Sequence, residues 1–419
     1  MTNNALKSWL DISPESDFSI YNLPYGIFST PTQAKTVGVA LGEYIIDLAA
    51  LAESKFWDIP MPASALRNGF LNDFIGLGSE LHAQVRQKIQ TLFTTEVPNF
   101  RAEASKFLVL QSAATLHLPV RIGDYTDFYS SLEHASNVGS MFRDANNPLL
   151  PNWKHLPVGY HGRSSSIVIS GTPIKRPWGQ IKPPTAESPI FQPSQQMDFE
   201  LEVAFVIGKS TQLGQRVNVN QAEEYIFGFV LFNDWSARDI QSWEYVPLGP
   251  FLGKNFGSSV SAWVVPLAAL EPFRTAAPTQ DPPPLPYLQA DQHTTFDLNL
   301  TVALQPQNGL PQVICQSNFK YLYWSVSQQI AHHTVNGCNL NIGDMCASGT
   351  ISGSQPDSFG SMLELTWRGT KPLKVQDVER KFLADYDTLT IRGVAQKGEI
   401  RVGFGEVKGQ ILPADPTAY

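Results

Sequence analysis

Short segments in which apolar and polar residues alternate recur along the chain, and this period of two favours β-strands over helices. Residues 296–304 alternate strictly, and residues 362–367 (MLELTW) do so over a shorter stretch. Residues 37–48 predict two strands joined by a tight turn at Gly42-Glu43, and residues 388–407 predict a second hairpin around Gln396-Lys397-Gly398. A mainly β fold follows, with a β-sandwich or roll as its largest part.

Three helices are expected to interrupt these strands. Residues 80–93 place apolar side chains on one helical face, with Ser79 as N-cap. A second helix starts at Asn220, and a third covers residues 319–335 and stops before Gly337. The Pro-rich residues 278–286 predict an extended surface loop. We therefore predict a small N-terminal β domain over residues 1–120 and a larger catalytic β domain over residues 121–419.

Composition excludes several classes of function. A formal charge of -8 over 419 residues argues against a nucleic-acid partner. The longest apolar segments, such as 226–232, are too short to cross a membrane. The three cysteines, Cys315, Cys338 and Cys346, match no zinc pattern and are expected to be buried free thiols. We expect a cytoplasmic enzyme.

A pair of carboxylates marks residues 197–207, MDFELEVAFVI. Strand alternation places Glu200 and Glu202 on one face, with Cβ atoms about 6.5–7 Å apart. Both carboxylates could bind one ion, and hard oxygen ligands favour Mg²⁺, Ca²⁺ or Mn²⁺. A solvated outer face of an edge strand explains the same pattern, so a metal site needs further ligands.

Candidate partners lie elsewhere in the chain. Asp234 follows the apolar residues 228–232 and is expected at a strand end, whereas Asp127 lies in a segment without clear periodicity. For either residue alone, a turn or capping role is a competing interpretation. Among eight histidines, His134 is the favoured water-activating base, because it lies near Asp127 and Arg143. The glycine-rich loops 251–259 and 349–354 match no phosphate-binding motif.

Longer segments make the chain recognisable. They include DYTDFYSSLEHASNVGSMFR, MDFELEVAFVIG, GFVLFNDWSARDIQSWEYVPLGPFLGKNFGSS and ASGTISGS followed by FGSMLELTW. Over residues 20–410 the chain resembles the longer members of the fumarylacetoacetate hydrolase family. The resemblance implies hydrolysis of 4-fumarylacetoacetate to fumarate and acetoacetate, the last step of tyrosine and phenylalanine catabolism. It also implies an N-terminal SH3-like barrel, a C-terminal β-roll and a homodimer.

The resemblance further implies a role for individual residues. His134 would activate water, and Glu364, on the strand MLELTW, would hold His134 in place. Arg238 would support the pocket. Ca²⁺ (or Mg²⁺) would be held by four carboxylates, those of Asp127, Glu200, Glu202 and Asp234. A second, structural Mg²⁺ would use Asp234, Lys254 and Ser258, the last being threonine in other members. Five residues would contact the substrate, namely Tyr129, Arg143, Gln241, Tyr245 and Thr350.

Two alternatives remain at this stage. The same metal site could serve acylpyruvate hydrolysis, decarboxylation or tautomerisation, which a panel of β-diketo acids would distinguish. A Ca²⁺-stabilised β protein that binds a partner, without enzymatic activity, would show metal-dependent stability and no turnover.

Overall fold

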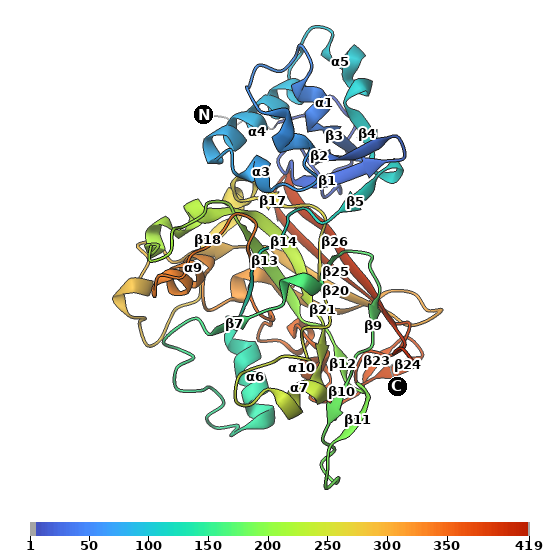
Figure 1. Ribbon diagram of the computed structural model, residues 1–419, viewed down its shortest axis with the longest axis vertical. Helices are drawn as coiled ribbons and strands as arrows, with labels where there is room; N and C mark the ends of the chain where they lie inside the picture. The colour runs from blue at the N-terminus through green and yellow to red at the C-terminus, as the bar shows by residue number, and fades with distance from the viewer. Residues whose placement is uncertain (1–5, 418–419) are drawn as a thin grey trace.

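A computed structural model describes residues 6–417 and shows a mainly β protein built around one large sheet (Figure 1). The predicted domains 1–120 and 121–419 include residues 1–5 and 418–419, which lie outside the described residues. In Figure 1 the N-terminal unit lies at one end of the molecule, and the strands of the remaining chain run away from it. The expected mainly β class is confirmed.

The central sheet has eight strands in the order β7-β6-β22-β13-β14-β16-β8, with β17 also paired to β14. The strands are β6 (Tyr125–Phe128), β7 (Gly159–His161), β8 (Ile167–Ile169), β13 (Leu201–Ile207), β14 (Ile226–Asp234), β16 (Ser258–Val260), β17 (Val265–Pro266) and β22 (Met345–Ala347). Two of its pairs, β22 with β6 and β16 with β8, are parallel, and its other pairs are antiparallel.

A second sheet has the order β21-β20-β25-β26-β9. Its strands are β9 (Ile174–Lys175), β20 (Asn299–Gln305), β21 (Gln312–Asn318), β25 (Thr388–Lys397) and β26 (Ile400–Leu412). The alternating segment 296–304 forms the end of β19 and most of β20, and β20 buries every second residue. The predicted hairpin over residues 388–407 is β25 and β26, with Gly398 at a φ of 59° in the turn.

The N-terminal unit combines a five-stranded sheet, in the order β4-β3-β2-β1-β5, with helices. Its elements are β1 (Tyr25–Thr30), β2 (Gln33–Leu41), β3 (Tyr44–Asp47), β4 (Leu108–Leu110), β5 (Thr115–His117), α1 (Leu48–Ala52), α2 (Ala63–Arg67), α3 (Asn72–Ile75), α4 (Ser79–Thr94) and α5 (Phe100–Glu103). The hairpin at Gly42-Glu43 and the helix over 80–93 are confirmed, although Gly78 rather than Ser79 is the N-cap. The SH3-like barrel stays a prediction.

The remaining elements connect these sheets. The helices are α6 (Leu132–Phe142), α7 (Arg238–Glu244), α8 (Leu267–Leu270), α9 (Val326–Thr334) and α10 (Met362–Leu365). The short strands pair as β10 (Trp178–Ile181) with β11 (Ile190–Pro193), β12 (Met197–Asp198) with β15 (Ser236–Ala237), β18 (Arg274–Ala276) with β19 (Thr294–Phe296), and β23 (Leu373–Val375) with β24 (Val378–Arg380). The 3₁₀ turns are η1 (Ala104–Lys106), η2 (Gln111–Ala113), η3 (Ser164–Ser166), η4 (Val219–Tyr225), η5 (Glu271–Phe273), η6 (Pro286–Leu288), η7 (Phe319–Tyr321) and η8 (Pro356–Ser358).

Two predicted helices differ from the structure. The helix expected from Asn220 is the 3₁₀ segment η4, which Asn218 caps. The helix expected over 319–335 splits into η7 and α9, because Ser325 forms a capping box and starts a new helix there. The Pro-rich segment 278–286 has no helix or strand over residues 278–285, as predicted, but its last residue, Pro286, begins the 3₁₀ turn η6.

The central sheet is buried on both faces. On β13, Val203 and Phe205 pack in the core shared with the second sheet, whereas Ala204 and Val206 pack in the core shared with the N-terminal unit. The solvated outer face considered for the Glu200–Glu202 strand is therefore wrong. A carboxylate on this strand lies inside the protein and needs a charge partner there.

Two further expectations concern cysteines and membranes. All three cysteines are free; Cys315 and Cys346 are buried as expected, but Cys338 is only partly buried. Within residues 6–417, no helix has the length and apolar character that a membrane span requires.

Candidate active site and metal centre

Four carboxylates meet at one end of the central sheet. Asp127 on β6, Glu202 on β13 and Asp234 at the end of β14 come from nearby strands, and Glu200 immediately precedes β13. Each side chain is buried, with at most 6% of the residue exposed. One oxygen from each carboxylate lies within 4.8 Å of the others. The sheet order therefore unites residues that are up to 107 positions apart in sequence.

Two buried cations contact this group. Lys254 Nζ donates to Glu200 Oε2 at 2.6 Å and to Asp234 Oδ2 at 2.8 Å. Arg238 donates through Nη1 to Glu200 Oε1 and through Nε to Asp198 Oδ2, each at 2.8 Å. Burial alone would raise the pKa of the Glu200 carboxyl, but Lys254 and then Arg238 lower it well below its ordinary value. Glu200 is therefore an ionised carboxylate.

Two carboxylates of the cluster have an oxygen without a partner. Within residues 6–417, Asp127 Oδ1 and Glu202 Oε1 are buried and have no hydrogen-bond partner. Burial, followed by the charge of Asp234, raises the pKa of Asp127 well above its ordinary value. Burial, followed by the charge of Asp127, does the same for the pKa of Glu202. Two unpaired acceptors held among like charges form a site that a cation would stabilise.

The charges support the same conclusion. The four carboxylates of the cluster, together with the neighbouring Asp198, Arg238 and Lys254, make a group of five carboxylates and two cations. With every carboxylate ionised, the formal charge of this group is −3, and a bound divalent ion would reduce it to −1. Buried oxygen ligands of this kind fit a hard cation such as Ca²⁺, Mg²⁺ or Mn²⁺.

The residues expected at a second ion fit less well. Burial lowers the pKa of Lys254, but Asp234 and Glu200 raise it by more, so its ammonium stays charged. An ammonium has no lone pair and cannot ligate a metal, so only the carbonyl oxygen of Lys254 could do so. Ser258 Oγ donates to Asp234 Oδ1 at 2.8 Å.

A histidine–carboxylate pair is buried in the same part of the molecule. His134 lies in the first turn of α6, whose N-cap Ser131 fixes the backbone there. Its Nδ1 donates to Glu364 Oε2 at 2.7 Å. Because an ionised carboxylate only accepts, Glu364 holds a proton on Nδ1, and in the neutral ring Nε2 carries the lone pair. The pair lies close to the metal centre, since a positive charge on His134 would lower the pKa of Glu200.

Three further donors hold Glu364 in place. Asn137 Nδ2 donates to Oε1 at 2.9 Å, Ser361 Oγ to Oε2 at 2.8 Å, and Ser352 Oγ lies 3.0 Å from both oxygens. Burial alone would raise the pKa of Glu364, but His134 and these hydrogen bonds bring it below its ordinary value. Glu364 is therefore a fixed, ionised acceptor for His134.

Two local predictions about these residues are wrong. Residues 362–365 form helix α10 rather than a strand, and Ser361 caps this helix at Glu364 N. Asp127, expected in an irregular segment, lies on β6 and pairs with Ala347 on β22 and Tyr160 on β7. The roles expected of Glu364 and Asp127 depend on side-chain position rather than on the type of element, and they stay predictions.

Three of the five expected substrate contacts lie at this site. The ring of Tyr129 packs edge-on against His134, with ring centroids 5.3 Å apart. Gln241 Oε1 accepts from Arg238 Nη1 at 3.2 Å. In the part of the chain that the structure describes, Thr350 Oγ1 and Arg238 Nη2 are buried without hydrogen-bond partners. These two groups could serve a ligand.

The other two expected contacts point elsewhere. Arg143 is exposed, and its Nε and Nη2 donate to the carbonyl of Pro148 at 3.1 and 2.8 Å. Tyr245 follows α7 and is 49% exposed. Either side chain would have to move to meet a ligand between the carboxylates and His134.

Sequence reasoning missed Tyr160. Its hydroxyl donates to Asp234 Oδ2 at 3.3 Å, and burial followed by Asp234 raises its pKa well above the ordinary value. A hollow of about 200 Å³ reaches the cluster here, lined by Tyr125, Tyr160, His161, Gly162, Arg163, Asp234, Pro250, Phe251, Lys254, Asn255 and Ser258. The segment VGYHG gave no signal for Tyr160, because its position depends on pairing with β6.

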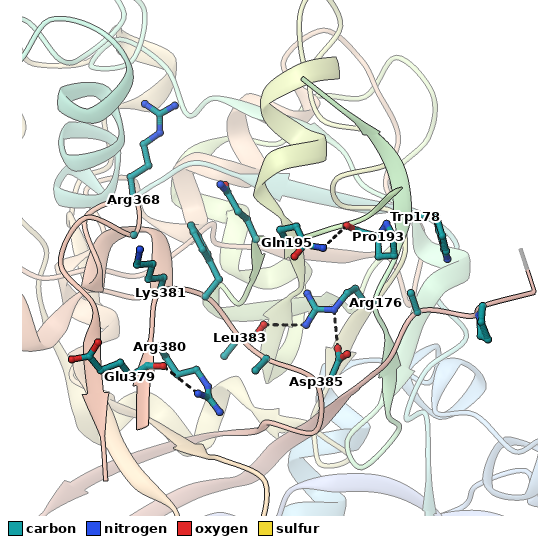
Figure 2. Close-up of a pocket in the computed structure, with 16 residues that line it drawn as sticks. Arg176, Trp178, Pro193, Gln195, Arg368, Glu379, Arg380, Lys381, Leu383 and Asp385 are labelled. Atoms are coloured by element: carbon teal, nitrogen blue, oxygen red, sulfur yellow. Dashed lines mark hydrogen bonds and ion pairs between the residues drawn. The ribbon is translucent and has the colours of Figure 1, made fainter. Parts of the chain in front are cut away.

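A larger hollow of about 960 Å³ contains none of the predicted site residues (Figure 2). Two of its four cations pair with carboxylates: Arg176 Nε donates to Asp385, and Arg380 makes two hydrogen bonds to Asp387.

Comparison with known proteins agrees with this geometry. The sequence model described as Fumarylacetoacetate (FAA) hydrolase C-terminal matches residues 124–411, and the one described as Fumarylacetoacetase N-terminal matches residues 21–119. The chain belongs to the fumarylacetoacetate hydrolase family. All fourteen predicted site residues fall within the larger of the two matched ranges.

Curated members of the fumarylacetoacetate hydrolase family match over nearly their full length. The fumarylacetoacetases of Dictyostelium discoideum and Homo sapiens are each 51% identical, covering 98% and 97% of this chain and 99% of their own. The fumarylacetoacetase of Arabidopsis thaliana is 48% identical over 98% of this chain and 99% of its own.

Solved structures support the fold. A fumarylacetoacetate hydrolase from Exiguobacterium antarcticum superposes with a TM-score of 0.54 at 17% identity, covering 93% of this chain and 99% of its own. A maleylpyruvate hydrolase from Sphingobium gives 0.52 at 14% identity, covering 94% and 100%. At these identities the likeness concerns the fold alone.

Proposed function

We propose that this chain hydrolyses the carbon–carbon bond of 4-fumarylacetoacetate, giving fumarate and acetoacetate. The observation that carries the proposal is a buried four-carboxylate cluster beside a His–Glu pair. These residues lie in a chain that is 51% identical to curated fumarylacetoacetases over nearly its whole length.

His134 is proposed as the general base. Its Nε2 takes a proton from water, and the oxygen of that water adds to the carbonyl carbon next to the bond that breaks. When this bond breaks, its electron pair stays with the acetoacetate fragment as an enolate, and the proton taken up by His134 neutralises this enolate and restores the base. Glu364 keeps the proton of His134 on Nδ1 and stabilises the imidazolium formed on proton transfer.

The four carboxylates are proposed to hold Ca²⁺ or Mg²⁺. When bound, a divalent cation supplies Lewis acidity toward a β-diketone and positive charge where the enolate develops. Arg238 and Lys254 hold Glu200 and Asp234 in position. A second Mg²⁺ near Asp234, through the carbonyl of Lys254 and the hydroxyl of Ser258, is a separate proposal.

Substrate oxygens are proposed to meet the unpaired groups Arg238 Nη2 and Thr350 Oγ1. Tyr129, which packs against His134, and Gln241, which accepts from Arg238, are proposed to contact the same substrate, and Arg238 is proposed to support the pocket. Arg143 and Tyr245 are proposed to turn inward only when a carboxylate of the substrate is present. For Arg143 this exchanges a hydrogen bond to a carbonyl for a stronger, charge-assisted pair.

The domain division and the cellular compartment are proposed on sequence and packing. We propose that residues 1–120 form an SH3-like domain and residues 121–419 the catalytic domain. Three free cysteines suit a reducing compartment, and the cytoplasm is the proposed location.

A homodimer is also proposed. Apolar side chains on β11 and in the loop after α7 are exposed, including Ile190, Val246, Leu248 and Phe251, with Leu248 96% exposed. A second copy of the chain is the proposed occupant of this face. Light scattering on wild type and Leu248→Asp tests it: two monomeric species would reject the dimer, and an unchanged dimer would place the interface elsewhere.

Product analysis tests the proposed reaction. NMR of the reaction mixture should show fumarate and acetoacetate in equal amounts from wild type. His134→Ala should lower the rate by about 10²–10⁴-fold, the usual contribution of a general base. His117→Ala, a partly buried histidine on β5, is the control and should keep the wild-type rate. Equal rates for His134→Ala and wild type would reject His134 as base.

A further inference from the structure

Asp198 has no assigned role, yet its carboxylate is fully buried and has four donors around it. Oδ2 accepts from Arg238 Nε at 2.8 Å and from the amide of Leu363 at 2.9 Å. Oδ1 accepts from the amide of Met362 at 2.6 Å and from that of Phe199 at 2.8 Å. Four hydrogen bonds use the full accepting capacity of a carboxylate, so this group is rigidly held.

The hydrogen bond from Arg238 connects Asp198 to the metal centre. Arg238 lies between two carboxylates, with Nε on Asp198 and Nη1 on Glu200. A planar guanidinium fixed at one edge by Asp198 presents its other edge to Glu200 in a fixed orientation. The orientation of Glu200, one of the four carboxylates of the cluster, therefore depends on Asp198.

The hydrogen bonds from the amides of Met362 and Leu363 connect Asp198 to the proposed general base, His134, through Glu364. Met362 and Leu363 are the first two residues of α10, and the next residue is Glu364. Their amides have no acceptor within the helix, so Asp198 supplies the acceptor that holds the first turn. Helix α10 has only one turn, so the position of its first residues determines where the Glu364 side chain lies. Glu364 Oε2 lies 2.7 Å from His134 Nδ1. The position of the His134–Glu364 pair therefore also depends on Asp198.

We propose that Asp198 is a positioning residue that fixes the metal centre and the base relative to each other. It acts through Arg238 on Glu200 and through the first turn of α10 on Glu364, and it touches neither substrate nor ion. The proposal deepens the proposed function and rests on it for the turnover readout. The competing interpretation is that Asp198 only neutralises a buried arginine and contributes to folding.

Asp198→Asn separates these interpretations. The amide has nearly the shape of the carboxylate, but it loses the charge and replaces one acceptor with a donor. Residues that hydrogen-bond to metal ligands usually contribute 10–100-fold to metal affinity or activity, and Arg238, which Asp198 holds, is such a partner of Glu200. We expect Asp198→Asn to bind Ca²⁺ about 10–100-fold more weakly than wild type, and to lower kcat by a similar factor at saturating Ca²⁺.

Asp387→Asn is the matched control. Asp387 is buried, accepts from Arg380 Nε at 2.8 Å and Nη2 at 3.0 Å, and accepts from the amide of Ala384 at 2.8 Å. It is thus another buried carboxylate that holds one arginine and a backbone amide, without contact to the cluster. Its Asn variant should lower thermal stability while leaving Ca²⁺ affinity and kcat unchanged.

A double-mutant cycle tests the path through Glu364. If Asp198 acts on turnover by placing Glu364, Asp198→Asn should cost far less kcat in a Glu364→Gln background than in wild type. Fully multiplicative effects would overturn this path. Equal Ca²⁺ affinities in wild type and Asp198→Asn, measured by calorimetry or by Ca²⁺-dependent Tm, would overturn the path through Arg238.

Failure of the proposed function remains distinguishable. A wild-type chain that does not turn over fumarylacetoacetate contradicts that function, while the Ca²⁺ affinities of Asp198→Asn and Asp387→Asn still decide whether Asp198 positions the metal centre. Misfolding of both Asp198→Asn and Asp198→Glu, with Asp387→Asn folded, would make Asp198 a folding residue and overturn the proposal.

Discussion

Replacing Glu202 by glutamine should change stability in opposite directions with and without a bound cation. Glu202 is fully buried, its Oε2 accepts from the amide of Gly349 at 3.0 Å, and its Oε1 has no partner. Glutamine keeps an acceptor for Gly349 and turns an amide donor toward the neighbouring carboxylates. The ion-free protein loses a repulsive charge, and the ion-loaded protein loses a ligand.

The size of each effect follows from the geometry. At about 4.8 Å and an effective dielectric constant of about 20, one pair of like charges costs about 3.5 kcal/mol, and protonation relieves part of this cost. We expect a gain of about 1–3 kcal/mol in the free energy of unfolding of ion-free Glu202→Gln. In wild type, Ca²⁺ at 100 times its dissociation constant should add about 2.7 kcal/mol. A variant that binds 100-fold more weakly would gain about 0.4 kcal/mol at that concentration.

Thermal unfolding in EDTA and in Ca²⁺ measures both effects. An unfolding entropy of about 2.1 cal/mol/K per residue gives about 0.9 kcal/mol/K for a chain of 419 residues. Ca²⁺ should therefore raise the Tm of wild type by about 3 °C and that of Glu202→Gln by less than about 1 °C. In EDTA the variant should melt about 1–3 °C above wild type. An unchanged Ca²⁺ increment would contradict a ligand role for Glu202, and an ion-free variant less stable than wild type would contradict repulsion at its carboxylate.

Three other predictions concern the same residues. Lys254→Met should destabilise the ion-free protein by about 3–5 kcal/mol, because it leaves Glu200 and Asp234 buried without their ammonium partner. Denaturant unfolding measures this, and an unchanged free energy of unfolding would contradict it. Glu364→Gln should lower kcat by about 10²–10⁴-fold without changing Ca²⁺ affinity, and a loss of affinity instead would contradict the separation of base and metal centre. In EDTA, the free energy of unfolding should fall as pH rises above the ordinary carboxyl range, because the raised pKa values of Glu202 and Asp127 make the folded state bind more protons than the unfolded state. Tm measured against pH in wild type and Glu202→Gln checks this. Equal slopes of Tm against pH in the two proteins would contradict it.

The strand pattern was predictable because the second sheet has one polar face. The segment 296–304 buries every second residue, and the hairpin over 388–407 carries its own turn signal. Strand β13 was harder to interpret, because Ala204 and Val206 pack against the N-terminal unit and both faces are apolar. The burial of Glu200 and Glu202 therefore depends on a contact between distant parts of the chain.

The strand predicted around Glu364 is a helix, and the residues before it carry a helix-start signal that the alternation of apolar and polar residues obscured. Ser361 followed by Glu364 three residues later is the start of a capping box, and Ser361 Oγ accepts from the Glu364 amide. Six alternating residues fit a strand equally well, so period alone could not decide. By contrast, nothing near Tyr160 or Asp198 in the sequence indicates their contacts, since these arise from strand pairing and from the packing of α10.

The central claim is that cleavage of fumarylacetoacetate depends on a cation held by the four buried carboxylates. A continuous absorbance assay of fumarylacetoacetate consumption, on protein stripped with EDTA and then supplied with Ca²⁺ or Mg²⁺, tests it directly. We predict loss of turnover in the stripped protein and its recovery when either ion is restored. Full turnover by protein that retains no divalent metal would contradict the claim.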